Sequence, residues 1–202
     1  MSVRCLICNH QNLESISHQQ RPGLFWHCLI CDFAFLDPME RALPEAEKAR
    51  YETHQNLSSD QGYRDFLKPI WGSLQELGQT DLKILDYGSG PTQALAEILR
   101  ELGHRVDCYD PFFAPTLMGK DYDLIVSTEA IEHFYDPRKE VLKMESLLAP
   151  NARIGEIWVM TQIFHKEKFA DWWYVRDFTH VCFFSREALS RLSPKIVLKE
   201  KV

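Results

Sequence analysis

The chain has 202 residues, of which 45% are hydrophobic and 26% are charged, enough apolar material for one domain with a small appendage. Its formal net charge of −6 opposes binding to a nucleic acid. No apolar run approaches the roughly 20 residues of a membrane span, and the first residues lack the apolar segment of a secretory signal. We therefore expect a cytoplasmic protein with no membrane partner, whose six cysteines are thiols or metal ligands.

Residues 1–38 contain two C-x-x-C pairs, Cys5 with Cys8 and Cys28 with Cys31. Each pair offers two thiolates from one tight loop, and zinc prefers four such ligands in a tetrahedron. A segment this short holds too small a core to fold alone, so a metal would supply the missing stability. We predict a closed, structural zinc site in a zinc-ribbon-like unit. Coincidental thiol pairs and rubredoxin-like iron are the alternatives.

Residues 39–80 are predicted to form a helical connector or lid. A polar helix is expected over about residues 39–51. Apolar residues then recur every three or four positions from Tyr63 to Leu77, which indicates an amphipathic helix. Pro69 should kink or split this helix, and Gly78 should end it.

The main domain is expected over residues 81–202. Strands are predicted near residues 84–85, 105–109, 123–127, 154–161 and 195–200, and helices near residues 94–102, 137–149 and 186–192. Ser185 can cap the last helix. Strands that alternate with helices indicate an α/β fold with a doubly wound, Rossmann-like and mostly parallel sheet.

A glycine loop follows the first strand of this domain. Residues 84–92 read Ile-Leu-Asp-Tyr-Gly-Ser-Gly-Pro-Thr, so Gly88 and Gly90 stand at alternate positions before a helix. Glycines there let the backbone approach a nucleotide-like ligand closely. Asp110 comes about 22 residues after Gly88, at the end of the next strand, where a carboxylate can accept two ribose hydroxyls.

The loop is unsuited to a phosphate. The third glycine of the dinucleotide fingerprint is missing, and the Walker pattern is absent. Pro91, placed at the expected first turn of the helix, also lacks the N–H that a pyrophosphate would use. We therefore predict a ligand that has a ribose but no phosphate.

Together these patterns resemble the class I S-adenosylmethionine-dependent methyltransferases, and in particular the group of ubiquinone-type methylases and zinc-carrying sugar C-methyltransferases. The resemblance covers roughly residues 50–195. The segments that carry it are residues 84–91, 109–111, 123–134 and 172–185.

The resemblance implies a methyltransferase (EC 2.1.1.-) that uses S-adenosylmethionine. Tyr51 and His54 would belong to an N-terminal lid. The implied cofactor-binding residues are Asp86 for the methionine ammonium, Gly88 and Gly90 for backbone contact with the methionine tail, Asp110 for the ribose, Phe112 or Phe113 for stacking on adenine, and Thr128, Glu129 and Ala130 along the reactive side.

The candidate catalytic bases are His133, His180 and Tyr174, with Glu132 and Asp177 as orienting groups. Each candidate also has a structural interpretation. His133 suits the turn after its strand, and an aromatic-rich stretch such as residues 172–184 often packs a core or lines a pocket. The remaining thiols are expected to be buried strand cysteines rather than nucleophiles, namely Cys108 and Cys182.

Three departures from the family pattern stand out. About a dozen residues separate Asp110 from Asp123, so the third strand–helix unit should be short or lost. The usual Pro-Gly-Gly turn is replaced by Pro-Asn-Ala at residues 150–152. The last two strands of the family's sheet have no clear room before Val202.

The favoured function is methyl transfer to a small molecule such as a sugar nucleotide, a quinone-like ring or a related metabolite. One alternative is an rRNA or tRNA methyltransferase with an N-terminal zinc unit, which the acidic charge opposes. Another is a non-catalytic, zinc-stabilised module that binds the cofactor. The acceptor atom stays open, and a homodimer is compatible with the sequence.

Overall fold

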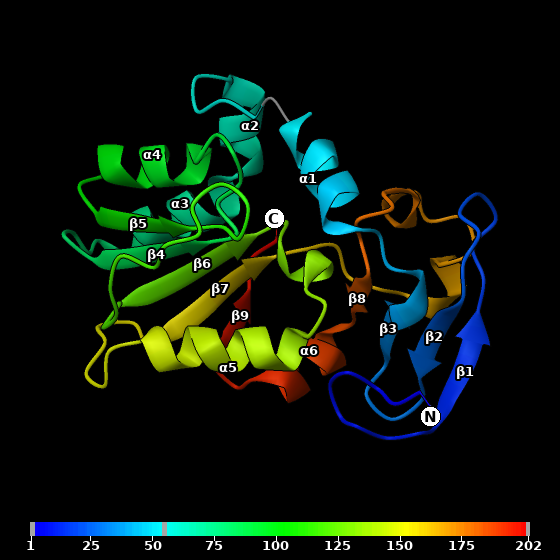
Figure 1. Ribbon diagram of the computed structural model, residues 1–202. Helices are drawn as coiled ribbons and strands as arrows, with labels where there is room; N and C mark the ends of the chain where they lie inside the picture. The colour runs from blue at the N-terminus through cyan, green and yellow to red at the C-terminus, as the bar shows by residue number, and fades with distance from the viewer. Residues whose placement is uncertain (1–2, 54–55, 201–202) are drawn as a thin grey trace. The chain divides into compact units, whose positions relative to one another are not determined.

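The computed structural model describes residues 3–53 and 56–200. Contacts divide the chain into two compact units, each assembled from segments that are distant in the sequence. Unit 1 draws on Met1–Glu47, Ile131–Leu142 and Thr161–Pro194, and unit 2 draws on Lys48–Ala130, Lys143–Met160 and Lys195–Val202. Each unit has its own sheet (Figure 1).

A five-stranded parallel sheet, in the order β5-β4-β6-β7-β9, forms the centre of unit 2 (Figure 1). Its central strands are short apolar runs that are buried almost throughout, as expected of a parallel sheet covered on both faces. The predicted α/β class with a mostly parallel sheet is therefore confirmed. The strands are β4 (Lys83–Tyr87), β5 (Arg105–Tyr109), β6 (Leu124–Thr128), β7 (Glu156–Met160) and β9 (Ile196–Leu198).

Three helices of unit 2 follow the amphipathic patterns of the sequence: α2 (Gln61–Phe66), α3 (Lys68–Leu77) and α4 (Ala94–Glu101). Pro69 lies in the first turn of α3, so the expected long helix is split at Leu67, as the proline predicted. The apolar faces of α3 and α4 pack against the sheet in one core that includes Ile70, Leu74, Leu95 and Leu99.

Two predicted helix starts differ from the structure. The helix expected from residue 39 is divided into a 3-10 turn, η1 (Pro38–Glu40), and helix α1 (Pro44–Glu52). The Asp37 carboxylate accepts a bond from the Met39 backbone N–H, which stabilises the separate turn. Helix α4 begins at Ala94, so Pro91 lies in the preceding turn and not in the first helical turn.

The predicted loss of the third strand–helix unit is confirmed within the described chain. Between β5 and β6, residues 111–122 contain neither a helix nor a strand, only turns and isolated bridges such as Asp110 with Ala114. At the other edge of the sheet, β9 pairs in parallel with β7. None of the described helices combines the length and the apolar character that crossing a bilayer requires.

Unit 1 is built on a four-stranded antiparallel sheet, in the order β1-β2-β3-β8. Its strands are β1 (Leu13–Ile16), β2 (Phe25–Cys28), β3 (Phe33–Leu36) and β8 (Cys182–Phe184). Aromatic rings fill the core of this unit, among them Phe25, Phe33, Phe164, Phe169 and Phe183.

Short helical segments complete unit 1. They are the 3-10 turns η2 (Ile131–His133), η3 (Lys166–Lys168) and η4 (Trp173–Arg176), and helix α6 (Arg186–Leu192). The Ser185 hydroxyl accepts a bond of 3.1 Å from the Ala188 N–H and caps α6, as the sequence predicted. Helix α5 (Pro137–Leu147) contributes residues to both units and begins where Asp136 accepts a bond from the Lys139 N–H.

The fourth strand of the N-terminal sheet comes from far along the chain. Phe33 pairs with Phe184, and Phe35 pairs with Cys182. Residues 3–38 therefore belong to the same compact unit as residues 161–194, and the two segments contribute strands to one sheet. The domain boundaries at residues 38 and 80 stay predictions. The two compact units each contain one of the two sheets.

Candidate functional site

The glycine loop lies at the carboxyl end of β4 in unit 2. Gly88 has φ +84° and Gly90 has φ +64°, in the left-handed region that glycine adopts without strain. A Cβ on Gly88 would stand 2.5 Å from the Cβ of Ala130, whereas a Cβ on Gly90 would meet nothing within 4 Å. Gly88 is thus required by both packing and backbone, and Gly90 by the backbone alone.

Asp86, the last acidic residue before this loop, is 1% exposed. Within the described residues its Oδ1 atom has no hydrogen-bond partner. The pKa of Asp86 is raised to about 7, mainly by burial; the charge of Arg100 lowers this pKa, and the charge of Asp110 contributes to raising it. A buried carboxylate oxygen without a donor is costly, and a cationic or N–H-bearing ligand would relieve that cost.

Asp110 lies where the sequence predicted, directly after β5, but three backbone amides of its own chain already bond to it. Its Oδ2 accepts from the Gly90 N–H at 3.0 Å, and its Oδ1 accepts from the N–H groups of Phe112 and Phe113 at 2.9 and 3.1 Å. An ionised carboxylate offers about four lone-pair sites. Asp110 therefore ties the glycine loop to the loop after β5 and keeps capacity for a ligand hydroxyl.

The remaining cofactor candidates lie at neighbouring strand ends. Thr128 ends β6, and Glu129 adopts φ +47° while its N–H donates to the Met160 carbonyl at 2.9 Å. A left-handed conformation is unusual for a glutamate and marks a constrained turn. The Phe112 ring contacts that of Tyr51 at a centroid distance of 5.7 Å. The proposed lid partner His54 lies outside the described residues.

The structure thus brings the cofactor candidates together at the carboxyl ends of β4, β5 and β6, where open α/β sheets bind ligands. Ser127 on β6 is a polar group at this edge that the sequence did not predict as part of the site. Its hydroxyl is buried and has no hydrogen-bond partner among the described residues. A single serine in an apolar strand matches no sequence motif, so the sequence did not identify Ser127 as a site residue.

The three catalytic candidates belong to unit 1 and also lie together. The rings of His133 and His180 have centroids 4.8 Å apart, and those of Tyr174 and His180 are 4.1 Å apart. Burial lowers the pKa of His133 to about 4, so its ring is neutral at pH 7. The lowered pKa makes His133 a weaker proton acceptor than an exposed imidazole.

Glu132 is fully buried beside these rings. One of its oxygens accepts from the Tyr174 hydroxyl at 2.5 Å and the other from the Thr161 hydroxyl at 3.1 Å. The Asp177 carboxylate accepts bonds from both the N–H and the hydroxyl of Thr179. The orienting roles of Glu132 and Asp177 stay predictions. Thr161 was missed because it is distant in sequence from the other members.

Arg21 is another residue that the sequence did not predict as part of the site. Its guanidinium donates to four backbone carbonyls at 2.8 or 2.9 Å, and it is 9% exposed. The acceptors are the carbonyl oxygens of Val175, Asp177, Phe178 and His180. Arg21 therefore fixes the loop that carries His180 against the N-terminal part of unit 1.

The four N-terminal cysteines converge as their spacing predicted. The Sγ atoms of Cys5 and Cys31 are 3.5 Å apart, as are those of Cys8 and Cys28, and all four lie within 4.8 Å of one another. These separations exceed a disulfide bond and approach the roughly 3.8 Å edge of a tetrahedron with metal–sulfur bonds of about 2.3 Å. The thiol set fits a zinc ion.

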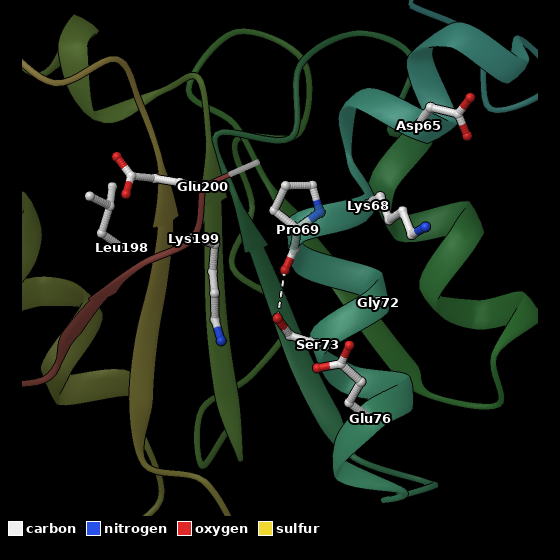
Figure 2. Close-up of a pocket in the computed structure, with 9 residues that line it drawn as sticks. All are labelled: Asp65, Lys68, Pro69, Gly72, Ser73, Glu76, Leu198, Lys199 and Glu200. Carbon is white, nitrogen blue, oxygen red and sulfur yellow. Dashed lines mark hydrogen bonds between the residues drawn. The ribbon is translucent and has the colours of Figure 1, made fainter. Parts of the chain in front are cut away.

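The other thiols, Cys108 and Cys182, are buried in β5 and β8, as predicted. A groove of about 700 Å³ also lies on unit 2 between α3 and the residues that end β9 and follow it (Figure 2). Lys68, Ser73 and Lys199 are among its lining residues. None of the predicted site residues lines this groove.

Comparisons with known proteins agree with the fold. A family model described as a methyltransferase domain matches residues 31–195. No protein of curated function matches the chain. Among solved structures, a candidate sarcosine dimethylglycine methyltransferase from Galdieria sulphuraria is 20% identical, with a TM-score of 0.35 over 45% of either chain. The chain thus spans under half the length of that protein.

A second solved structure is the plantazolicin methyltransferase BpumL in complex with SAH. It is 17% identical, and the match covers 78% of this chain and 76% of that chain with a TM-score of 0.46. Neither likeness is close enough to carry an argument about function. The family match, which spans most of the chain, is the informative comparison.

Proposed function

This chain belongs to the methyltransferase domain family, and from that premise we propose that it transfers a methyl group from S-adenosylmethionine to a small-molecule acceptor. Asp86 is the observation that carries the proposal. Its buried Oδ1 lacks a donor among the described residues, at the end of β4 and beside the glycine loop. The ammonium of the cofactor's methionine part would supply that donor.

When bound, S-adenosylmethionine supplies an electrophilic methyl group on a sulfonium, so the protein's task is chiefly to bind and align. Gly88 and Gly90 keep the loop backbone close to the ligand. Asp110 would accept a ribose hydroxyl with its remaining lone pair, and Phe112 or Phe113 would stack on the adenine. Thr128 and Glu129 would line the reactive side.

His133, His180 and Tyr174 are the candidate bases that would take a proton from the acceptor atom, and Glu132 orients Tyr174 through their 2.5 Å hydrogen bond. A net charge of −6 favours a small acceptor over RNA. The proposed acceptors are a sugar nucleotide, a quinone-like ring or a related metabolite, and the proposed location is the cytoplasm.

We further propose that Cys5, Cys8, Cys28 and Cys31 hold a structural Zn²⁺ ion. Four thiolates close the coordination sphere and leave no position for a substrate. Residues 39–80 are proposed as a helical connector or lid, a role supported by the contact of Tyr51 with Phe112. We also propose that the chain forms a homodimer.

The cofactor proposal is tested by calorimetric titration of the zinc-replete full chain with S-adenosylmethionine and with S-adenosylhomocysteine. We expect micromolar binding of both. Asp110→Ala should weaken it at least tenfold, because the variant loses the ribose acceptor and loosens two loops at once. Asp65→Asn, a change to an exposed carboxylate on α2, is the matched control and should bind like the wild type.

Acceptor specificity is tested separately with methyl-labelled cofactor. Transfer of label to a small metabolite would support the proposal. Transfer to RNA that declines steeply with salt would replace it with the RNA alternative. Tight cofactor binding without turnover on any acceptor would favour a non-catalytic module, and absence of binding by the zinc-loaded chain would contradict the cofactor proposal itself.

A further inference from the structure

Unit 1 contains a second group of metal-ligand side chains besides the four cysteines. Glu132, His133 and His180 each offer one ligand atom, and these three atoms lie within 4.8 Å of one another. Two imidazoles and one carboxylate form a donor set typical of divalent zinc and ferrous iron. We propose that Glu132, His133 and His180 bind a divalent transition-metal ion.

The hydrogen bonds of His133 and His180 determine which ring nitrogen carries the proton and which can bind a metal. Nδ1 of His133 lies 2.9 Å from the Thr179 carbonyl oxygen, and Nδ1 of His180 lies 2.7 Å from the Tyr174 carbonyl oxygen. A carbonyl oxygen only accepts, so each Nδ1 must carry the proton. In a neutral ring Nε2 then carries the lone pair, which is the state that metal binding requires.

The carboxylate of Glu132 is oriented in the same way. The hydroxyls of Tyr174 and Thr161 donate to different oxygens of Glu132, and a carboxylate oxygen that accepts a hydrogen bond can also bind a metal. Metal ligands in proteins are characteristically held by such outer hydrogen bonds, which fix their geometry and raise their basicity. All three proposed ligands of this cluster have them.

The charge and the lone pairs of Glu132, His133 and His180 also favour a bound cation. The cluster gathers the fully buried carboxylate of Glu132, the buried ring of His180 and the half-buried ring of His133, all of which are electron-pair donors. A divalent ion would oppose the carboxylate charge and join the three donors. The three ligand atoms lie within 4.8 Å of one another, so side-chain movements on the order of 1 Å bring them to the spacing of bound ligands.

Three protein ligands leave at least one coordination position open, as in catalytic zinc sites. With the ion bound, the Nε2 atoms of His133 and His180 would be ligands and would no longer serve as bases. The site needs only unit 1 residues, and it does not depend on cofactor binding in unit 2.

Substitution with cobalt allows the two proposed metal sites to be counted from the metal content and distinguished by their absorption spectra. The full chain is produced in cobalt-supplemented minimal medium, and its metal content and absorption spectrum are measured. We expect two Co²⁺ ions per chain. One should show the thiolate charge-transfer absorption of a four-cysteine site, and the other should show d–d absorption without that band.

Substitutions then assign the second ion. His133→Ala and His180→Ala should each reduce the content from two ions to one and keep the thiolate band, which reports that the N-terminal site is intact. Glu132→Gln, which preserves the shape of the side chain, should weaken Co²⁺ binding at least tenfold. His165→Ala, on an exposed histidine of unit 1, is the matched control and should keep two ions.

Tyr174→Phe tests the outer hydrogen bond. It removes the hydroxyl that donates to Glu132 and should weaken Co²⁺ at the second site about 10- to 100-fold. A wild-type chain that binds only the thiolate-ligated ion would overturn the proposal. So would two ions retained in both histidine variants. Neither result bears on S-adenosylmethionine binding, which the calorimetric titration measures independently.

Discussion

A carboxylate buried at the end of a strand raises the free energy of the folded state until a cation or a donor opposes its charge. Asp86 is in this situation: it is 1% exposed, its Oδ1 has no partner among the described residues, and its pKa is raised to about 7. At the residue scale, the missing partner of the Asp86 carboxylate marks the site. The burial of this carboxylate also predicts an effect on stability that can be measured without any ligand.

Asp86 should make stability depend on pH in a defined direction. Its folded pKa of about 7 lies above the unfolded value near 3.9, so between these values the folded state retains a proton that the unfolded state has released. The free energy of unfolding should therefore fall as pH rises from about 4 to about 7, by up to roughly 1.4 kcal/mol per pH unit from this group.

Urea unfolding of the cofactor-free wild type and of Asp86→Asn, at several pH values between 5 and 7.5, measures the effect. The asparagine keeps the shape but does not titrate, so the wild type should lose stability relative to the variant as pH rises. Parallel profiles of the two proteins would show that Asp86 is not the group responsible. Asp65→Asn should follow the wild type.

At the scale of elements, the segment from η4 to β8 depends on a residue more than 150 positions earlier. Arg21 bonds to the carbonyls of Val175, Asp177, Phe178 and His180. Burial lowers the pKa of Arg21 to about 10, which still leaves it charged at pH 7. One guanidinium thus replaces the sheet or helix bonds that this irregular loop lacks.

Arg21→Met should release that loop. The variant keeps apolar contacts but leaves four buried or half-buried carbonyls without their donor, so we expect a loss of about 3 kcal/mol in the free energy of unfolding. Hydrogen exchange of the amides of residues 175–181 should accelerate more than that of β4 to β6. Arg176→Met, at an exposed position of the same loop, should leave both measurements near wild type.

Unchanged exchange in residues 175–181 of Arg21→Met would contradict the role of Arg21. The same variant also bears on the histidine pair. Because His180 lies at the end of the loop that Arg21 holds, a looser loop should weaken any metal that His180 binds while the four-cysteine site keeps its ion.

At the scale of the whole molecule, unit 1 is an assembly of three separated segments. The antiparallel sheet takes β1, β2 and β3 from the N-terminus and β8 from residues 182–184. A metal bound by the four cysteines would therefore support more than residues 1–38. It would also support the sheet on which the segment after His180 is held.

Loss of the proposed zinc should consequently destabilise β8 as well. Cys8→Ser should lose the ion, lower the free energy of unfolding by about 4 kcal/mol when free zinc exceeds the wild-type dissociation constant about a thousandfold, and accelerate exchange of the β8 amides. Metal analysis, zinc-dependent unfolding and hydrogen exchange measure these three effects. Cys108→Ala removes a buried thiol of unit 2 and should leave the zinc content unchanged.

Zinc-independent unfolding in the wild type would refute this view of unit 1. A zinc effect confined to residues 3–36, with β8 exchange unchanged, would instead support the zinc-ribbon-like unit as an independent domain, as the sequence boundary at residue 38 implies.

Local signals in the sequence determined a large part of this protein. The period of apolar residues predicted the alternating strands and helices, Pro69 predicted the break between α2 and α3, and C-x-x-C spacing predicted the convergence of four thiols. The glycine loop and Asp110 were found for the same reason. In each case the signal is a short pattern, such as one C-x-x-C pair, one glycine loop or one acidic strand end.

Tertiary structure alone decided which distant residues meet. The pairing of β3 with β8, the bonds of Arg21 to the loop at residues 175–180, and the bonds of Thr161 and Tyr174 to Glu132 all join segments that no local pattern connects. Burial likewise determines the pKa values of Asp86 and His133. Desolvation and long-range hydrogen bonding depend on the packed neighbours of a group, and a sequence read along one chain does not specify those neighbours.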